Sequence, residues 1–383
     1  MKVHQKSSWI AGISLSLFAL FNMTAARAEP GITAGTIVIG QSAGFSGSVA
    51  EDVKQATAGA QLYFDMVNKR GGIFGRKIVL ESLDDGFEPK RTLENTRKLL
   101  DEKNAFALFL YRGTPTTESI IPLISEAGVP LIAPVSGASS LHEPMHRYVF
   151  NVRARYRDEV GTAVYQLSGM GLQRYAVFAS NDSFGMDALE GLKQAIKKHK
   201  LPEPVIANYE RNTVAVDGAV KKILDAKPQA VLMFCTAKAC SAFIQEYRKA
   251  GGTQQLITLS NVSSQVFLQG LGKDARGLGM TQVFPNPRNS TALISKEFLT
   301  AIKNRSEFSD SYPTLEGFIS AKVLVEGLRR AGAKPTRDGL VSALEGMGGF
   351  DLGGMLLKYG PTSRDGSNFI ELTVIGGDGQ VLR

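Results

Sequence analysis

The chain has 383 residues, of which 43% are hydrophobic, and a formal net charge of +8. This is the composition of a globular protein, and its length exceeds what one hydrophobic core usually serves, so we expect two domains. The positive charge is spread along the chain apart from KKHK at 197–200. We interpret that cluster as a solvated helix end, because no compact basic face with interleaved aromatic residues accompanies it. A nucleic-acid partner is therefore not expected.

The first 28 residues have the pattern of a secretory signal peptide. Two lysines precede an apolar stretch at 9–21. Ala-Arg-Ala at 26–28 places small residues at the two positions that a signal peptidase recognises. The apolar stretch is shorter than the roughly 20 residues that span a bilayer. Glu29, not Cys, follows the cut, so no lipid anchor is expected. The sequence thus predicts cleavage after Ala28 and a soluble protein exported to a periplasm, without a membrane anchor.

From residue 36 onward, segments typical of strands alternate with segments typical of helices. Repeated β-α units of this kind favour a parallel, doubly wound sheet with right-handed crossovers. The continuously apolar segment at 105–111 is typical of a strand covered on both faces. Strands are expected at 36–40, 76–85, 105–111, 129–137 and 148–153, and helices at 49–72, 88–104 and 114–128.

The alternation starts again after Arg153, which predicts a second α/β lobe in tandem with the first. Its expected strands are 175–182, 204–211, 230–236 and 255–261, and its expected helices are 157–171, 184–199, 215–227 and 238–252. Three helices then follow without obvious strands between them, at 290–304, 314–332 and 336–347. The segment 354–382 is interpreted as a hairpin-like finish with a long turn.

The cysteines and histidines do not indicate a catalytic or metal site. Cys235 and Cys240 are the only cysteines; in an oxidising compartment they could pair, or they could stay free, and spacing alone does not decide. HEPMH at 142–146 satisfies the zincin pattern, which needs both histidines on one face of a regular helix. Pro144 lies between them and would break such a helix, so a zinc protease is not expected. No cofactor is implied.

Several motifs together resemble one known family. Their order and spacing are similar to periplasmic substrate-binding proteins of branched-chain amino acid-type ABC transporters, over nearly the whole chain after the signal. The resemblance implies two Rossmann-like doubly wound lobes joined by a three-strand hinge, the type I periplasmic binding fold. The lobes would be 29–153 with 284–352, and 154–283 with 353–383. The motifs are IxIGxSxxxSG at 37–47, the stretch from Ala56 to Leu99, GTPT at 113–116, EAGVPLIAP at 126–134, RYVFNVRA at 147–154, NDSFGMDAL at 181–189 and LEGFISAKVLVEGLRRAG at 315–332.

Ligands of parallel α/β sheets bind beyond the carboxyl ends of the strands. Three loops of the first lobe qualify: Ser42 to Ser48, Arg112 to Thr117, and Val135 to Ser139. In the loop from Arg112 to Thr117, hydroxyl and backbone N–H groups around Thr114 and Thr116 could hold a carboxylate. Alternatively, these threonines could merely cap a helix.

By resemblance, the ligand carboxylate would be held by Thr114, Ser136 and Gly137, and Phe184 would contact the ligand. Phe318 would line the cleft. Asn261 falls where amino acid binders carry an acid; an amide cannot neutralise an ammonium group, so an α-amino acid is doubtful. Arg112 favours an anionic ligand without a positive group.

Asp85 and Glu316 are the candidates for replacing the missing acid. The ligand site predicted from the sequence therefore comprises Ser42, Arg112, Thr114, Thr116, Ser136, Gly137, Phe184, Asn261 and Phe318.

The resemblance implies a binding protein and not an enzyme. We expect the monomeric solute-binding component of an ABC importer, which captures an amino acid or related carboxylate by hinge closure and delivers it to membrane permease subunits. A sensor subunit that presents its ligand to a membrane receptor is the alternative. A secreted hydrolase is disfavoured, because GFSGS misses the G-x-S-x-G spacing and no histidine is well placed as a general base.

Overall fold

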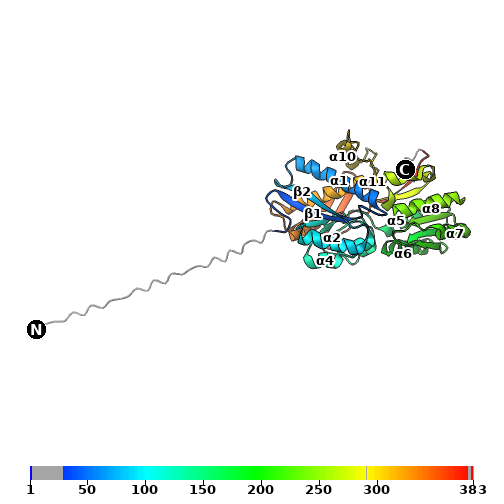
Figure 1. The fold of residues 1–383 in the computed structure, drawn as a ribbon, viewed down its shortest axis with the longest axis horizontal. Coiled ribbons are helices and arrows are strands. Elements are labelled where there is room, and N and C mark those ends of the chain that lie inside the picture. Colours follow the sequence, from blue (N-terminus) through cyan, green and yellow to red (C-terminus); the bar gives the residue numbers. More distant parts are fainter. Residues whose placement is uncertain (2–28, 290, 378–380, 383) are drawn as a thin grey trace.

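The computed structural model describes residues 29–289, 291–377 and 381–382, together with Met1. The predicted signal peptide falls on residues outside this part of the chain. Two α/β lobes lie side by side, and the N-terminal half of the chain supplies most of one of them (Figure 1). The predicted architecture of two doubly wound lobes is confirmed.

A parallel five-stranded sheet forms the centre of the first lobe, in the order β2-β1-β3-β4-β5. Its middle strand is fully buried because helices cover both faces, as the apolar run there predicts. Phe64, Phe109 and Phe150 belong to the core between sheet and helices. The strands are β1 (Thr36–Ala43), β2 (Lys77–Asp84), β3 (Ala107–Phe109), β4 (Leu131–Ile132) and β5 (Val149–Phe150).

Helices from distant parts of the sequence pack together in this lobe. Helix α11 lies against α1, and glycines let their backbones approach closely: a Cβ atom added to Gly317 would lie 1.7 Å from the Ala56 carbonyl oxygen. The segment after residue 290 thus returns to the first lobe. Its helices are α1 (Ala50–Lys69), α2 (Pro89–Asp101), α3 (Thr114–Glu118), α4 (Ile121–Ala127), η1 (Ser139–Leu141), α10 (Leu293–Ile302), α11 (Tyr312–Ala331) and α12 (Arg337–Glu345).

The single helix predicted over 114–128 is wrong, because the chain forms two short helices there. Helix α3 ends at Glu118, and α4 begins at Ile121 with Pro122 in its first turn. A proline in a helix interior lacks an N–H group and its ring clashes with the preceding turn, whereas the first turn tolerates it. The break limits α3 to five residues.

The second lobe contains a seven-stranded sheet in the order β14-β13-β10-β9-β8-β6-β7, of which β13 and β14 are antiparallel additions. Its strands are β6 (Tyr175–Ser180), β7 (Val205–Tyr209), β8 (Ala230–Phe234), β9 (Gln255–Thr258), β10 (Gly279–Gln282), β13 (Glu371–Ile375) and β14 (Val381–Leu382). Its helices are α5 (Tyr156–Gly169), α6 (Ser183–His199), α7 (Asp217–Ala226), α8 (Ala237–Lys249), η2 (Ser260–Val262), α9 (Gln265–Leu271) and η3 (Gly272–Ala275).

The hairpin-like finish predicted over 354–382 holds only for its last part, where β13 and β14 form an antiparallel pair; the segment as a whole is not one hairpin. Strand β12 (Leu356–Tyr359) pairs with β11 (Gly348–Asp351), whereas β13 pairs with β10 in the other lobe. The reason is burial: Leu357 and Tyr359 belong to the first core, and the Tyr359 ring lies edge-on to Phe150 with 5.3 Å between ring centroids. The chain therefore crosses between the lobes after β12.

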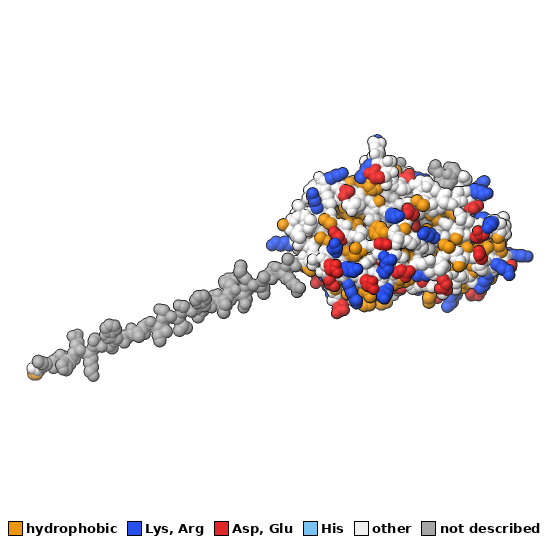
Figure 2. All heavy atoms as spheres, viewed as in Figure 1, with side chains coloured by type: hydrophobic (Ala, Val, Ile, Leu, Met, Phe, Trp, Pro, Cys, Tyr) orange, Lys and Arg blue, Asp and Glu red, His pale blue; other side chains and the backbone are white. Residues whose placement is uncertain are grey.

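Two further features concern the surface and the helices. Lysine and arginine side chains are interspersed with aspartate and glutamate on the face seen in Figure 2, so this face carries no patch of one sign. Among the described helices, none combines the length and apolar character that a bilayer span requires.

Candidate functional site

A small enclosed cavity of about 20 Å³ lies between the two lobes. Loops that follow parallel strands of both sheets supply most of its walls, as expected for ligand sites of this architecture. The first lobe contributes the loops after β2, β3 and β4, and the second contributes those after β6, β8 and β9. The lining residues are Val49, Phe87, Arg112, Gly113, Thr114, Val135, Tyr156, Phe184, Thr236 and Asn261.

The first-lobe wall carries a cation and a pair of hydroxyl groups. Thr114 Oγ1 lies 2.8 Å from Ser136 Oγ, so these two hydroxyls are hydrogen-bonded to each other. Arg112 is buried, and its Nη2 donates across the cleft to the backbone carbonyl of Asn261 at 2.6 Å. A guanidinium and two hydroxyls converging in this way form a suitable receptor for a carboxylate.

Asp52 lies behind Arg112 and partly balances its charge. The nearest nitrogen and oxygen of the two side chains are 3.8 Å apart, and Asp52 is almost completely buried. Burial raises the pKa of Asp52 above its ordinary value, and the Arg112 charge opposes that rise without reversing it. Asp52 also lines a separate, larger hollow of about 720 Å³ between α1 and α8.

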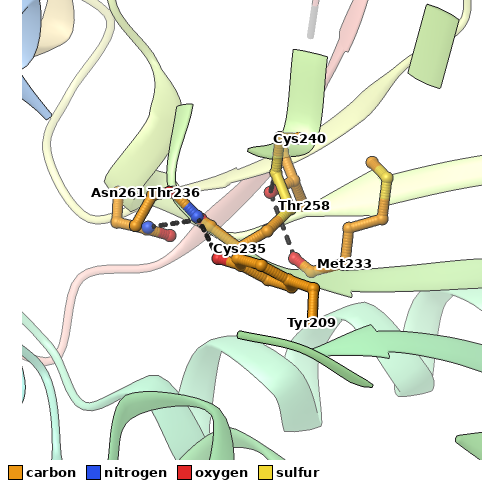
Figure 3. The surroundings of a disulfide bond; sticks show 7 residues. All are labelled: Tyr209, Met233, Cys235, Thr236, Cys240, Thr258 and Asn261. Carbon is orange, nitrogen blue, oxygen red and sulfur yellow. Dashed lines mark hydrogen bonds between the residues drawn. A yellow bond between two sulfur atoms is a disulfide. The ribbon is translucent and has the colours of Figure 1, made fainter. Parts of the chain in front are cut away.

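The second-lobe wall combines an aromatic pair with two polar side chains. The rings of Phe184 and Tyr156 meet edge-on with centroids 4.9 Å apart. Asn261 Nδ2 donates to the carbonyl of Cys235 at 2.9 Å, and Thr236 follows Cys235 at the end of β8. Cys235 and Cys240 form a buried disulfide with Cα atoms 5.5 Å apart, beside Thr236 and Asn261 (Figure 3).

Direct contacts across the cleft hold the lobes together. The Arg211 guanidinium lies 3.9 Å from the centroid of the Phe87 ring and donates to the Phe87 carbonyl oxygen. Asp182 accepts from the same guanidinium at 2.9 Å and so fixes it within the second lobe. Ser183 donates to Glu118 at 2.6 Å across the same seam. The two lobes are therefore in direct contact beside the cavity.

A buried ionic network lies where the chain crosses from β5 to α5. Arg153 is surrounded by Glu159 at 3.7 Å and Glu316 at 3.5 Å, and it also donates to Ser260 Oγ. These side chains come from both lobes. Burial raises the pKa of Glu159, although the Arg153 charge and hydrogen bonds from Thr281 and Ser260 oppose that rise.

The structure brings four of the predicted site residues together around the cavity: Arg112, Thr114, Phe184 and Asn261. Ser136 supports them through its hydrogen bond to Thr114. Gly137 lies next to the crossover, where an added Cβ would come within 2.7 Å of Tyr156 N.

The remaining three predicted residues face elsewhere. Ser42 Oγ donates to Asp85 at 2.9 Å, and Thr116 Oγ1 donates to the carbonyls of Arg112 and Gly113, so these hydroxyls satisfy local groups. Thr116 does not cap the helix either: it lies within α3, whose N-cap Gly113 has no side-chain cap bond, and its hydroxyl donates back to the preceding turn. Phe318 packs in the first core between Tyr63 and Phe298, because α11 buries that face against α1. These three side chains do not line the cavity in this structure.

The two acids considered as replacements also point away from the cavity. Asp85 accepts hydrogen bonds from Ser42, Phe87 N and Thr92, and burial raises its pKa despite them. Glu316 pairs with Arg153. Of the described residues that line the cavity, none is acidic and Arg112 alone is charged.

The histidines of HEPMH do not form a metal site. His142 pairs with Asp365, and His146 Nε2 lies 2.8 Å from the Ser140 carbonyl oxygen, in a segment without regular helix. The described residues contain no cluster of three metal-ligating side chains.

Sequence reasoning missed several lining residues. Thr236 follows β8 and Phe87 follows β2, so the rule about strand ends could have found both had it been applied to every strand. Val49 and Tyr156 stand at the starts of α1 and α5, where the sequence offers no separate signal. These two residues are buried because the opposite lobe packs against them.

Comparison with known proteins identifies the family of the chain. The sequence profile described as periplasmic binding protein matches residues 36–371. The Leu/Ile/Val-binding protein homolog 3 of Brucella melitensis biotype 1 is 25% identical over 313 residues, which are 80% of this chain and 83% of that protein.

Two solved structures have the same overall form. A substrate-binding periplasmic protein from Ralstonia solanacearum has a TM-score of 0.86 and 35% identity, covering 90% of this chain and 99% of that chain. A possible leucine/isoleucine/valine-binding protein from Rhodopirellula baltica SH 1 has a TM-score of 0.87 and 30% identity, covering 91% and 97%. These are two-lobed ligand-binding proteins of type I architecture. The chain belongs to the periplasmic binding protein family, of the branched-chain amino acid type.

Proposed function

We propose that this chain is the soluble periplasmic solute-binding component of an ABC importer. It is exported with cleavage after Ala28, acts as a monomer and catalyses no reaction. It captures a small carboxylate between its lobes and delivers it to membrane permease subunits, which supply the energy of transport together with their ATPase. The observation that carries this proposal is a cavity lined by both lobes, with the lobes already in contact around it.

The two moving bodies are proposed to be residues 29–153 with 284–352, and residues 154–283 with 353–383. The separate sheets support this division. Strand β12 packs on the first body, so we move 353–359 from the second body to the first and place the last crossover after Tyr359. Hinge closure of such bodies is a common way to trap a ligand.

The carboxylate of the ligand is proposed to bind at the first-lobe wall. Thr114 and Ser136 exchange their mutual hydrogen bond for bonds to the carboxylate, and Arg112 exchanges the Asn261 carbonyl for it. Charge-assisted hydrogen bonds to an anion are stronger than the neutral bonds they replace. Phe87, Val135 and Phe184 supply apolar contact for the rest of the ligand.

The small cavity also bears on the mechanism. A volume of about 20 Å³ is close to what a single water needs. A carboxylic acid with several carbon atoms therefore enters an open form, and closure around it stops before the packing seen here. The ligand favours the closed form by contacting both walls, which is the differential affinity that a population shift requires.

Isothermal titration calorimetry of the mature protein with small aliphatic and aromatic carboxylates tests the proposal. Arg112→Gln should weaken binding at least about 30-fold, because truncating one partner of a buried charge pair costs about 2 kcal/mol or more. Arg97→Gln, on the exposed face of α2, is the matched control and should bind as the wild type does. Binding that Arg112→Gln leaves unchanged would refute the anion site.

A further inference from the structure

Two polar atoms in the second-lobe wall of the cavity lack partners. Asn261 Oδ1 and Thr236 Oγ1 are both inaccessible to solvent, and neither makes a hydrogen bond of ordinary geometry with a described residue, although the Thr236 side chain lies near the Tyr209 hydroxyl. Both residues line the cavity, and they lie side by side on the loops after β9 and β8 (Figure 3). A buried polar group without a partner is costly, so a ligand group that pairs with these atoms would bind favourably.

The orientation of the Asn261 amide follows from its surroundings. Its Nδ2 faces the Cys235 carbonyl at 2.9 Å, and a carbonyl can only accept, so the amide nitrogen must lie on that side. Oδ1 is therefore the atom left without a partner. It can only accept a hydrogen bond, which means that the matching group on the ligand must be a donor.

The wall is held in place before any ligand arrives. The disulfide ties Cys235 to Cys240 in α8, which fixes the carbonyl that orients Asn261. The backbone N–H of Thr236 donates to the Tyr209 hydroxyl at 3.0 Å. A preorganised wall loses little entropy on binding, so pairing its two free atoms adds directly to affinity.

The charges around the cavity select the kind of donor. An ammonium group would meet no acidic side chain among the described lining residues, and the only charged neighbour there is the Arg112 guanidinium. Burying a charge without a partner is far more costly than burying a hydrogen-bonded neutral group. A plain methylene, in turn, would leave both polar atoms unpaired. A hydroxyl can donate to Asn261 Oδ1 and at the same time accept from Thr236 Oγ1.

We propose that the site is selective for a small hydroxy carboxylate, whose hydroxyl pairs with Asn261 and Thr236 while its carboxylate binds at Arg112, Thr114 and Ser136. The inference rests on the proposed function, since it takes the interlobe cavity to be the ligand site.

Three matched sets of compounds test this selectivity by titration calorimetry at pH 7 on the mature protein. Each set shares one carbon skeleton and varies only the 2-substituent: lactate, alanine and propionate; 2-hydroxy-3-methylbutanoate, valine and 3-methylbutanoate; 3-phenyllactate, phenylalanine and 3-phenylpropionate. In the set that fits the cavity, the hydroxy acid should bind about tenfold more tightly than the unsubstituted acid. The amino acid should bind most weakly.

Two variants locate the effect. Asn261→Asp supplies the missing negative charge, so the preference should reverse towards the amino acid of the same set. Thr236→Val keeps the side-chain shape and should remove most of the advantage of the hydroxyl without affecting the unsubstituted acid. It also tests the inference independently if Asn261→Asp fails to fold, which circular dichroism would reveal. Asn368→Asp, an exposed site, controls for added charge.

The outcomes separate this inference from the proposal on which it rests. Equal binding of hydroxy and unsubstituted acids, or tighter binding of the amino acid by the wild type, would overturn the inference and leave a carboxylate-binding protein. Binding of none of the nine compounds would overturn both, because the small-carboxylate ligand would then be wrong.

Discussion

The two walls of the cavity differ in what they need from a ligand. In the first lobe, Thr114 and Ser136 bond to each other, and Arg112 is partly balanced by Asp52. In the second lobe, Asn261 and Thr236 each keep one atom without a partner, next to a disulfide. The first wall can exchange existing bonds for an anion, whereas the second gains bonds only when a donor arrives. The proposed function thus assigns anion capture to the first lobe and ligand discrimination to the second.

The largest effect is expected where the two lobes share charges. Arg153→Met should lower the free energy of unfolding by about 3–5 kcal/mol, because Glu159 and Glu316 would remain buried without their cation. Chemical denaturation monitored by circular dichroism measures the change. Arg91→Met, whose side chain is half exposed, should change stability by less than about 1 kcal/mol. An equal, small effect for both would show that the lobes close without this network.

Removing the disulfide should lower both the stability of the protein and the binding contributed by the second-lobe wall. The bond closes a loop of about six residues, so Cys235→Ser with Cys240→Ser should cost about 2 kcal/mol of stability. Because the Cys235 carbonyl orients Asn261, binding of hydroxy acids should fall more than binding of unsubstituted acids. Thermal denaturation and calorimetry on the same variant give both quantities. Undiminished preference for the hydroxyl would mean that the wall is rigid without its disulfide.

Removing the contact between the Phe87 ring and Arg211 should have a smaller effect. Phe87→Leu keeps apolar volume but removes the ring under Arg211, and the contact is expected to contribute about 1 kcal/mol, or fivefold in the closing equilibrium. Small-angle X-ray scattering should show a larger radius of gyration in the variant. Phe74→Leu is the matched control, since Phe74 is also at positive φ but exposed. Identical scattering of both variants would exclude a role in closure.

The smallest effect is expected for acid, which should reduce the stability that Asp365 contributes. Burial alone would raise the pKa of Asp365, but His142 and Arg155 outweigh it and hold the pKa below its ordinary value of 3.8. A depressed carboxyl pKa gives stability that is present above the unfolded value and lost as pH falls through the folded one. Asp365→Asn should therefore be less stable than the wild type at pH 6, with the difference shrinking as the pH falls below about 4. A difference independent of pH would contradict the assignment.

Much of the fold could be predicted because its signals are local. Apolar runs such as 105–111 and the alternation of strands with helices indicated both lobes. The C-terminal pairing could not be found in this way, since whether 356–359 pairs with 348–351 or with 371–375 depends on which core accepts Leu357 and Tyr359. The break before Pro122 was a local signal that was overlooked.

The site was predictable to the extent that it follows strand ends. That rule and the resemblance predict Arg112, Thr114, Phe184 and Asn261 as site residues, and these four line the cavity. Phe318 was misplaced, because a helix position alone does not say whether an aromatic ring faces the cleft or the core. The free atoms of Asn261 and Thr236 depend on distances between loops, which no sequence pattern expresses.

The central claim is that this chain binds a small carboxylate between its lobes and does nothing else to it. A thermal-shift screen of the mature protein against amino acids, hydroxy acids, and aliphatic and aromatic carboxylates tests it most directly. A ligand present at 100 times its Kd should stabilise the native state by about 2.7 kcal/mol, which raises the melting temperature. The account predicts such a rise with at least one carboxylate, and its loss in Thr114→Val. A rise that Thr114→Val retains in full, or turnover of any compound, would contradict it.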